Sequence, residues 1–391
     1  MSRELIDLND DLKRLHEEGY ELEVRGSCLL VHSVPYLNSK KEIKYGILVS
    51  QLELAGDKTV KPQDHTTHFI GEHPHDREGN VITAIQNASG DKDLGEGIVI
   101  NHTFSNKPQN GYSDYFEKMT NYIKIVSYQA ASVDPQVTAK VFKTVEEGGS
   151  ESPFNYIDTN SGRAEIDAIS AKLKKLKIGI IGLGGTGSYI LDLVSKTPVG
   201  EIHIFDKDIF LSHNAFRAPG AASVEKLREL NSKVKYLHEI YSKIHKYIYP
   251  HEFNIIAANL GELPSLDFIF ICVDSGEDKK ILIEKLIADR VPFIDTGIGI
   301  NAINGLLTGS VRTTTCTPEK SDHINKRISF ANTKNDDYDK NIQIAELNSL
   351  NASLAVIKWK KFFGFYHDLE KEHNSDYNIN VNKIINDEAD S

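Results

Sequence analysis

The chain has 391 residues, of which 40% are hydrophobic, and a formal net charge of −11 at pH 7. This length exceeds what one hydrophobic core usually organises, so we expect two domains, and the acidic balance argues against nucleic acid as the main partner. No apolar run approaches the roughly 20 residues that cross a bilayer, and the N-terminal residues are polar, so we expect a cytoplasmic protein without membrane contact.

Residues 1–146 have the pattern of a small α+β domain. Leucines recur at helical spacing from Leu5 to Leu15, and Gly19 ends this opening helix. Short apolar runs bounded by turn residues then predict strands at 22–25, 28–33 and 44–52. A longer helical pattern follows at 115–142. A polar stretch rich in Glu, Gly and Ser begins at 146, so we place a linker over 147–162. The role of this first domain is not evident from its residues.

A histidine cluster in this domain raises the question of a metal site. His65, His68, His73 and His75 have H-x-x-H and H-x-H spacings, which metal ligands also use. However, Pro74 indicates a loop rather than a helix that would align the imidazoles. We therefore favour ordinary histidines, with metal binding as the alternative.

The three cysteines do not form a recognisable site. Cys28, Cys272 and Cys316 lie far apart in the sequence, and none belongs to a C-x-x-C pair. This spacing argues against both a disulfide framework and a thiolate zinc site. We expect reduced thiols and no structural zinc.

Beyond the linker, strand and helix patterns alternate. Strands are predicted at 178–181, 202–205, 268–273, 291–294 and 306–315, and helices at 163–173, 232–245, 280–288 and 342–362. Such alternation predicts a Rossmann-like, doubly wound α/β domain with a mostly parallel sheet over 163–365. The polar tail at 366–391 is rich in Asn and Asp, and we expect it to be disordered.

A glycine cluster directly follows the first of these strands, at Gly182, Gly184, Gly185 and Gly187. The missing Cβ atoms let a phosphate approach the backbone, and the start of the next helix supplies unpaired N–H groups. Asp206 and Asp208 follow the second strand, where nucleotide-binding folds place an acid for the ribose hydroxyls. The pattern predicts a bound nucleotide, and a tight turn without a ligand is the alternative.

Four residues further along narrow the choice of nucleotide. Asn214 and Arg217 follow the two acids, Lys233 lies on the next predicted helix, and Asp274 ends a later strand. Cations and a carboxylate at one edge of a sheet suit a triphosphate with Mg²⁺, whereas a dehydrogenase has no general need for them. Each residue alone is compatible with a helix cap or a solvated side chain, but together they favour ATP and Mg²⁺.

Over about 163–361 the chain resembles the superfamily of ThiF, MoeB and ubiquitin-activating adenylyltransferases. The motifs that carry the resemblance are GLGGTGS at 182–188, the D-x-D of Asp206 and Asp208, the N-x-x-R of Asn214 and Arg217, Lys233 and Asp274. In that family the first acid binds the ribose of ATP, the Asn, Arg and Lys hold the phosphates, and the later Asp binds Mg²⁺. The resemblance implies these roles for Asp206, Asn214, Arg217, Lys233 and Asp274, in that order.

The resemblance also implies roles for two residues outside these motifs. An arginine ahead of the first strand usually reaches the γ-phosphate, often in the partner subunit, and Arg163 is the best-placed candidate. Many relatives carry a cysteine that takes the acyl group as a thioester or persulfide, and Cys316 in TTTCTP lies at that place. Its thiol would be a nucleophile only if a cation or a helix end lowered its pKa. An inert cysteine at a strand end is the alternative.

The function implied by the resemblance is ATP-dependent adenylation of the C-terminal carboxylate of a ubiquitin-like or sulfur-carrier protein. The resemblance to these adenylyltransferases also implies a homodimer. The combination with an additional first domain is similar to bacterial ubiquitin-like conjugation systems, which makes a conjugating enzyme a further candidate partner. Three alternatives remain: a sulfur-carrier activator of thiamine or molybdopterin-type biosynthesis, an NAD-dependent oxidoreductase, and a non-catalytic scaffold that binds a nucleotide. The sequence does not identify the carrier.

Overall fold

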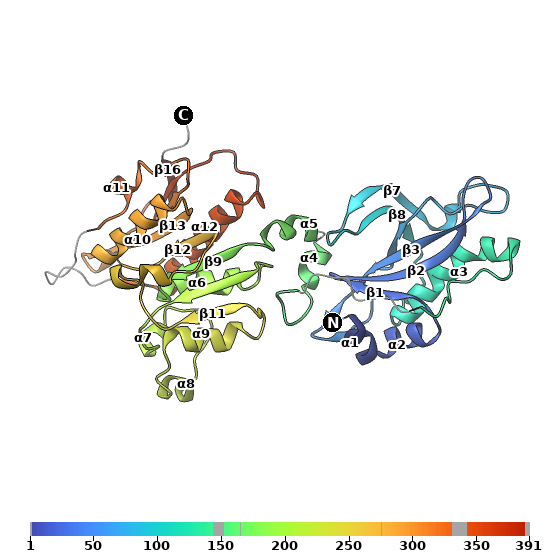
Figure 1. The fold of residues 1–391 in the computed structure, drawn as a ribbon, viewed down its shortest axis with the longest axis horizontal. Helices are drawn as coiled ribbons and strands as arrows, with labels where there is room; N and C mark the ends of the chain where they lie inside the picture. The colour runs from blue at the N-terminus through green and yellow to red at the C-terminus, as the bar shows by residue number, and fades with distance from the viewer. Residues whose placement is uncertain (1, 144–151, 165, 275, 331–341, 388–391) are drawn as a thin grey trace. The chain divides into compact units, whose positions relative to one another are not determined.

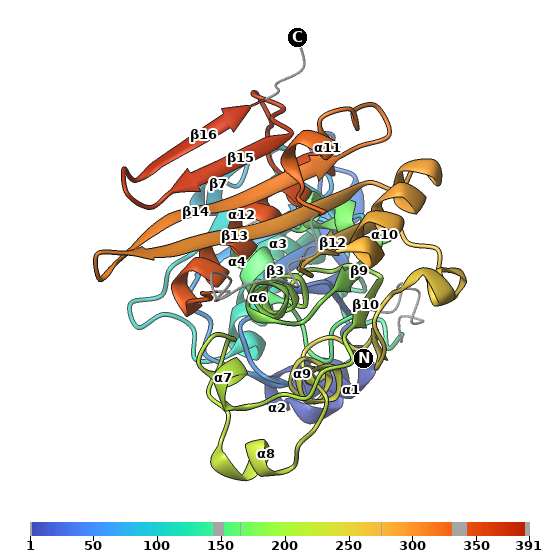
Figure 2. The same ribbon diagram turned by 90° about the vertical axis from the view of Figure 1, so that its left-hand side faces the viewer.

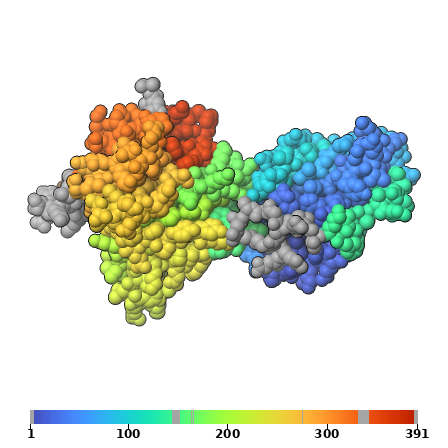
Figure 3. Space-filling model, in the orientation of Figure 1, coloured from blue at the N-terminus to red at the C-terminus, as the bar shows by residue number. Residues whose placement is uncertain are grey.

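The computed structural model describes residues 2–143, 152–164, 166–274, 276–330 and 342–387. The chain divides into two compact parts, Met1–Ala171 and Lys172–Ser391, which we call unit 1 and unit 2. Figure 1 shows them as ribbons and Figure 3 as a space-filling model, with unit 1 in blue to green and unit 2 in green to red. Among the helices of the described residues, none combines the length and the apolar character needed to span a bilayer.

Unit 1 is an antiparallel sheet with helices packed on it. The strand order is β1-β2-β3-β6-β8-β7, and α3 packs against β2 through a core that includes Leu48, Met119 and Tyr122. A smaller apolar cluster, which includes Cys28 and Val49, completes the core. The elements are α1 (Ser2–Leu8), α2 (Asp10–Glu17), β1 (Leu22–Arg25), β2 (Cys28–Leu37), β3 (Ile43–Gln51), β4 (Leu54–Ala55), β5 (Lys58–Thr59), β6 (Thr66–Ile70), η1 (Thr83–Ile85), β7 (Gln86–Asp93), β8 (Val99–Ser105), α3 (Tyr115–Val133), α4 (Thr159–Arg163) and α5 (Asp167–Ser170).

The segment predicted as a linker belongs in part to unit 1. Residues 144–151 lie outside the described residues, but Phe154 is buried, and the carboxylate of Asp158 accepts hydrogen bonds from two backbone N–H groups in the first turn of α4. Residues up to Ala171 thus pack with unit 1, and the domain boundary at 147–162 stays a prediction. The polar composition that indicated a linker also supplies the residues that cap short helices.

Unit 2 is built on one large sheet with the strand order β11-β10-β9-β12-β13-β14-β15-β16. The strands from β11 to β13 in this order are parallel, and the remaining strands are antiparallel. This confirms the predicted α/β class with a mostly parallel sheet. The elements are η2 (Ala171–Leu173), β9 (Lys177–Ile181), α6 (Gly185–Val194), β10 (Glu201–Phe205), α7 (Ser212–Ala215), α8 (Val224–Arg228), α9 (Lys233–Tyr241), β11 (Ile248–His251), η3 (Ala257–Glu262), β12 (Phe268–Ile271), α10 (Glu277–Ala288), β13 (Phe293–Ile303), β14 (Leu306–Cys316), α11 (Ile324–Arg327), α12 (Ala345–Phe362), β15 (Asn374–Asn378) and β16 (Lys383–Asp387).

Two apolar cores cover the two faces of this sheet. One core contains side chains of α6, α9 and α12, including Leu191, Leu237 and Trp359. The other contains side chains of α10 and of the segment after β14, including Leu282 and Ile328. The strand order reverses between β9 and β12, because β10 continues from β9 on one side while β12 pairs on the other. In open α/β sheets, ligands bind in the crevice at the carboxyl ends of such neighbouring strands.

The C-terminal tail is folded, contrary to the prediction of disorder. β15 pairs with β14 and β16 pairs with β15, so that the four strands β13–β16 lie side by side in Figure 2. Asn374 is fully buried, and its side-chain carbonyl accepts a hydrogen bond from the Thr314 hydroxyl (2.7 Å). Asn and Asp are depleted in strands, which made the composition misleading, whereas the edge of β14 offers unpaired backbone groups that a polar segment can still bond. Residues 388–391 lie outside the described residues.

Candidate active site

The glycine cluster forms the turn between β9 and α6. Gly182 has a φ of +90°, and a Cβ on Gly187 would lie 1.9 Å from the Gly182 carbonyl oxygen. A Cβ on Gly185 would overlap the side chain of Asn348, whereas a Cβ on Gly184 would have no atom within 4 Å. The protein's own packing therefore requires three of these glycines, and only at Gly184 is space left for a ligand.

Asp206, at the end of β10, holds this turn. Its Oδ2 accepts a hydrogen bond from the backbone N–H of Leu183 (2.8 Å), and its Oδ1 accepts one from the N–H of Asp208 (2.8 Å). Only 5% of the residue is exposed. The sequence assigned Asp206 to the ribose, and the structure additionally makes it the anchor of the glycine turn.

Lys233 lies in the same cluster. Its ammonium nitrogen is 2.8 Å from Asp208 Oδ2 and 3.4 Å from Asp206 Oδ2. The lysine begins α9, and the hydroxyl of Ser232 caps that helix by accepting from the N–H of Lys235. Lys233 is buried while the Asp208 side chain is 59% exposed, so Lys233 is paired with the two acids rather than left as an open cation.

Asn214 and Arg217 carry buried donors without partners. The side-chain oxygen of Asn214 accepts from the backbone N–H of Leu211 (2.9 Å). Neither the Nδ2 of Asn214 nor the Nε of Arg217 has a hydrogen-bond partner among the described residues, although both atoms are buried. An unsatisfied buried donor costs about 1–3 kcal/mol, and more when the group is charged. An anionic ligand such as a phosphate would satisfy both.

Asn348, which belongs to none of the sequence motifs, joins the N-x-x-R segment to the glycine turn. The residue lies on α12 and is fully buried. Its Oδ1 accepts from the hydroxyl of Thr186 (3.1 Å), and its Nδ2 donates to the carbonyl of Arg217 (3.4 Å). The available signal was a pair of asparagines, Asn348 and Asn351, among the apolar positions of the predicted helix.

Asp274 lies just beyond β12 with an exposed side chain. The N–H of Cys272 donates to the carbonyl of Ile181 on β9 (2.8 Å), and a Cβ on Gly182 would lie 2.7 Å from the Cys272 carbonyl oxygen. The strand end that carries Asp274 is therefore packed against the glycine turn. Arg163 belongs to α4 of unit 1; its side chain lies outside the described residues, and its role stays a prediction.

Cys316 lies at the end of β14 in the environment of a structural cysteine. Only 2% of the residue is exposed, and it packs in the apolar core beside α10. Burial raises the pKa of its thiol to about 12, so the thiolate fraction at neutral pH is on the order of 10⁻⁵. The two cations nearest to Cys316 in the sequence are both engaged: Arg312 with Asp295 and Thr314, and Lys320 with Asp322. The condition for a nucleophilic thiol is not met in this structure.

We therefore expect the Cys316→Ser variant to keep the wild-type rate of ATP–pyrophosphate exchange within about twofold, because adenylation needs no thiol. Exchange rates of the two proteins, measured with the same carrier, check this. A carrier adduct that is cleaved by reductant in the wild type and missing in the variant would contradict the structural role of Cys316.

The four histidines of the predicted cluster in unit 1 each form a hydrogen bond to another protein group. His65 bonds the hydroxyl of Ser105 and His68 that of Thr103, while Nδ1 of His73 and Nδ1 of His75 donate to the backbone carbonyls of Pro74 and His73, respectively. Within the described ranges, no three His, Cys, Asp or Glu side chains gather where a metal ion would be held.

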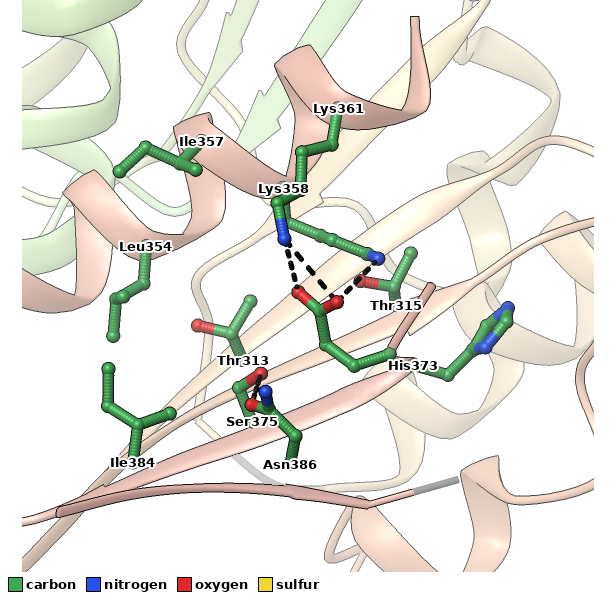
Figure 4. A pocket seen from close by; sticks show the side chains of 11 residues that line it. Thr313, Thr315, Leu354, Ile357, Lys358, Lys361, His373, Ser375, Ile384 and Asn386 are labelled. Carbon is green, nitrogen blue, oxygen red and sulfur yellow. Dashed lines mark hydrogen bonds and ion pairs between the residues drawn. The ribbon is translucent and has the colours of Figure 1, made fainter. Parts of the chain in front are cut away.

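A separate pocket of about 180 Å³ lies between α12 and strands β14–β16. Figure 4 shows Lys358 and Lys361 pointing into it, and both ammonium groups are paired with Glu372, at 3.5 and 3.1 Å. No residue predicted for the nucleotide site lines this pocket. It is therefore distinct from the cluster around the glycine turn.

Both parts of the chain match known family models. Residues 10–159 match a family model described as a domain of unknown function (DUF6791), and residues 162–373 match that of the ThiF family. Ubiquitin-like modifier-activating enzyme 5 of Xenopus laevis is 22% identical over 145 residues, which are 34% of this chain and 36% of that protein. The same enzyme of Dictyostelium discoideum is 23% identical over 144 residues, 34% of this chain and 38% of that protein. The chain thus spans little more than a third of the length of these relatives.

Among solved structures, that of MccB from E. coli with ATP is 18% identical and covers 59% of this chain and 71% of that chain, with a TM-score of 0.44. PaaA is 15% identical, covering 56% of this chain and 75% of that chain, with a TM-score of 0.45. Such distant likenesses carry no argument about activity. The ThiF match, in contrast, spans more than half of the residues. The chain belongs to the ThiF family.

Proposed function

We propose that this protein is an ATP-dependent adenylyltransferase that activates the C-terminal carboxylate of a ubiquitin-like protein. The observation that carries the proposal is the pair of buried donors without partners, Asn214 Nδ2 and Arg217 Nε. They belong to a segment that Asn348 joins to the glycine turn. A dehydrogenase site does not call for such donors, whereas a triphosphate does, because its oxygens carry the charge that they would neutralise.

The residues of the site divide the binding of ATP among them. Helix α6 begins directly after Gly184, where a Cβ would meet no atom within 4 Å, and the N–H groups of its first turn suit a phosphate. Asp206 is assigned to the ribose, and Asn214 and Arg217 to phosphate oxygens. Lys233 has three donor positions, so it can keep Asp208 while it also meets a phosphate. The proposed role of Asp208 is to hold the Lys233 ammonium in place through their ion pair.

The reaction that fits this site is nucleophilic displacement at the α-phosphorus. The carrier's C-terminal carboxylate is ionised at neutral pH and needs no general base. Its oxygen forms a bond to the α-phosphorus, the bond from that phosphorus to the bridging oxygen breaks, and pyrophosphate leaves with the electron pair. The protein's contribution is alignment and neutralisation of the charge on the leaving group.

The donor set at the end of β12 fits Mg²⁺. At nucleotide sites this ion is bound by one or two carboxylates, while substrate phosphates and water supply its other ligands. The exposed carboxylate of Asp274, beside the glycine turn, is the protein ligand that we assign. When bound, Mg²⁺ would neutralise phosphate charge.

The proposed carrier is a ubiquitin-like protein. Curated relatives are named for the activation of a ubiquitin-like modifier, and a sulfur-carrier protein would undergo the same first step. The proposal includes that the protein forms a homodimer. It also includes a conjugating enzyme as a further partner, as the combination of unit 1 with the ThiF part suggests.

Exchange of labelled pyrophosphate into ATP tests the proposal directly. The wild type is expected to catalyse exchange only with Mg²⁺ and with a carrier whose C-terminal carboxylate is free, and Asp274→Ala is expected to lower the rate. Exchange with a sulfur carrier but with no ubiquitin-like protein would replace the carrier assignment. No exchange with any carrier, or exchange undiminished in Asp274→Ala, would reject the mechanism.

A further inference from the structure

A buried charged cluster lies next to the strand end that carries Asp274, and the adenylation site described above does not include it. The cluster consists of Lys279 on α10, Asp295 on β13 and Arg312 on β14. Asp295 is completely buried, and its two carboxylate oxygens meet one cation each: Lys279 Nζ at 2.5 Å and Arg312 Nη2 at 2.7 Å. The three side chains together carry a net charge of +1.

Lys279 is an unfavourable residue for its position. It lies in the first turn of α10, where the partial positive charge of the helix end repels a cation. It is also buried, with a side chain only 6% exposed, and burial disfavours the charged form of an amine. Asp295 compensates the charge, but an apolar residue would fill the same space without needing that compensation. The lysine therefore has a structural task that its charge alone does not explain.

That task is visible in its second contact. Besides Asp295, the Lys279 ammonium donates a hydrogen bond to the backbone carbonyl of Val273 (3.2 Å). Val273 directly precedes Asp274. It also packs on the glycine turn, because a Cβ on Gly182 would lie 2.7 Å from Val273 Cγ1. One lysine thus joins the body of the sheet, through Asp295, to the backbone beside the assigned metal ligand.

We propose that Lys279 is a positioning residue for the metal ligand: held by Asp295, it fixes the Val273 carbonyl and thereby sets the place of Asp274 at the glycine turn. The inference rests on the proposed function in one respect, that Asp274 binds the Mg²⁺ of Mg·ATP. Residues that orient a metal ligand typically change metal affinity about 10–100-fold when they are replaced.

The test compares ATP affinity with and without Mg²⁺, measured by calorimetry on the full-length chain. In the wild type, Mg²⁺ is expected to tighten ATP binding. In Lys279→Met, this tightening is expected to fall about tenfold, while the affinity for metal-free ATP is expected to stay unchanged because the Lys279 ammonium is engaged with Asp295 and the Val273 carbonyl. Lys285→Met is the matched control, since Lys285 lies on the same helix and forms an exposed pair with Asp289 (2.7 Å); it is expected to behave as the wild type.

A second variant separates positioning from folding. Lys279→Met leaves Asp295 with only one of its two cations, whereas Lys279→Met combined with Asp295→Asn restores the cluster's net charge of +1 and still lacks the hydrogen bond to Val273. The fluorescence of Trp359, the chain's single tryptophan and a core residue of unit 2, checks that each variant is folded. The double variant is expected to keep the Mg²⁺ defect.

The outcomes distinguish this inference from the proposed function. A double variant with the Mg²⁺ dependence of the wild type overturns the inference, whatever the exchange assay gives. A wild type whose ATP affinity is independent of Mg²⁺ also overturns it. If the wild type shows the Mg²⁺ dependence and the variants lose it, but no carrier supports pyrophosphate exchange, the inference stands and the proposed function fails.

Discussion

Replacing Arg217 by alanine is expected to lower the rate of ATP–pyrophosphate exchange about 10²–10³-fold, the usual effect of removing one donor that stabilises developing charge. The backbone of Arg217 is held from two sides, because its N–H donates to the Asn214 carbonyl (3.0 Å) and its carbonyl accepts from Asn348. Its guanidinium, in contrast, keeps a buried Nε without a partner among the described residues. The charge is thus available for a ligand.

The same variant is expected to fold as stably as the wild type or slightly more so, because it removes an unsatisfied buried donor. Urea unfolding followed by Trp359 fluorescence measures this, since that side chain is fully buried in unit 2. Arg228→Ala is the control, because Arg228 is an exposed arginine of α8, and it is expected to leave exchange unchanged. If Arg217→Ala exchanges pyrophosphate within tenfold of the wild-type rate, the guanidinium does not neutralise the triphosphate.

The sequence predicted the parallel part of the fold better than its edges. Apolar runs such as 178–181 and 268–271 are buried on both faces, so their strand character is plain in the residues themselves. The hairpin of β15 and β16 has no such pattern, because its strands are polar and owe their order to the backbone groups of β14. The packing of 152–171 with unit 1 was not predictable for a similar reason: the caps and short helices in this segment use the residue types that a linker also uses.

The residues of the candidate site were predictable where they lie next to the end of a strand or helix that the sequence itself indicates. Asp206 follows the end of β10, Arg217 follows α7 and Lys233 begins α9, and the parallel sheet brings such element ends to one edge. The pairing of Lys233 with Asp208 was not predictable, because it depends on side-chain directions. Asn348 and Asp295 are far from the motif in sequence and are brought to it by α12 and β13. Single residues that act through long-range contacts leave no spacing to recognise.

Replacing Gly187 by alanine is expected to destabilise unit 2 by about 3 kcal/mol, which corresponds to a decrease in Tm of about 6–12 °C. Helix propensity alone predicts the opposite, since alanine is favoured over glycine in a helix by about 1 kcal/mol. However, the new Cβ would lie 1.9 Å from the Gly182 carbonyl oxygen and 3.0 Å from its carbon. Gly182 cannot easily move away, because its N–H donates to the Phe205 carbonyl (2.9 Å) and its φ is +90°.

Gly184→Ala is the matched control for this clash, because the same methyl group at that position meets no protein atom within 4 Å. Its unfolding midpoint, followed by Trp359 fluorescence, is expected to stay within about 0.5 kcal/mol of the wild type, while its affinity for ATP falls because the methyl group occupies the space beside the start of α6. Together the two variants separate the glycines that the turn itself requires from the one that a phosphate requires. A Gly187→Ala protein as stable as the wild type would show that the turn relaxes. Unchanged ATP affinity in Gly184→Ala would place the phosphates away from this glycine.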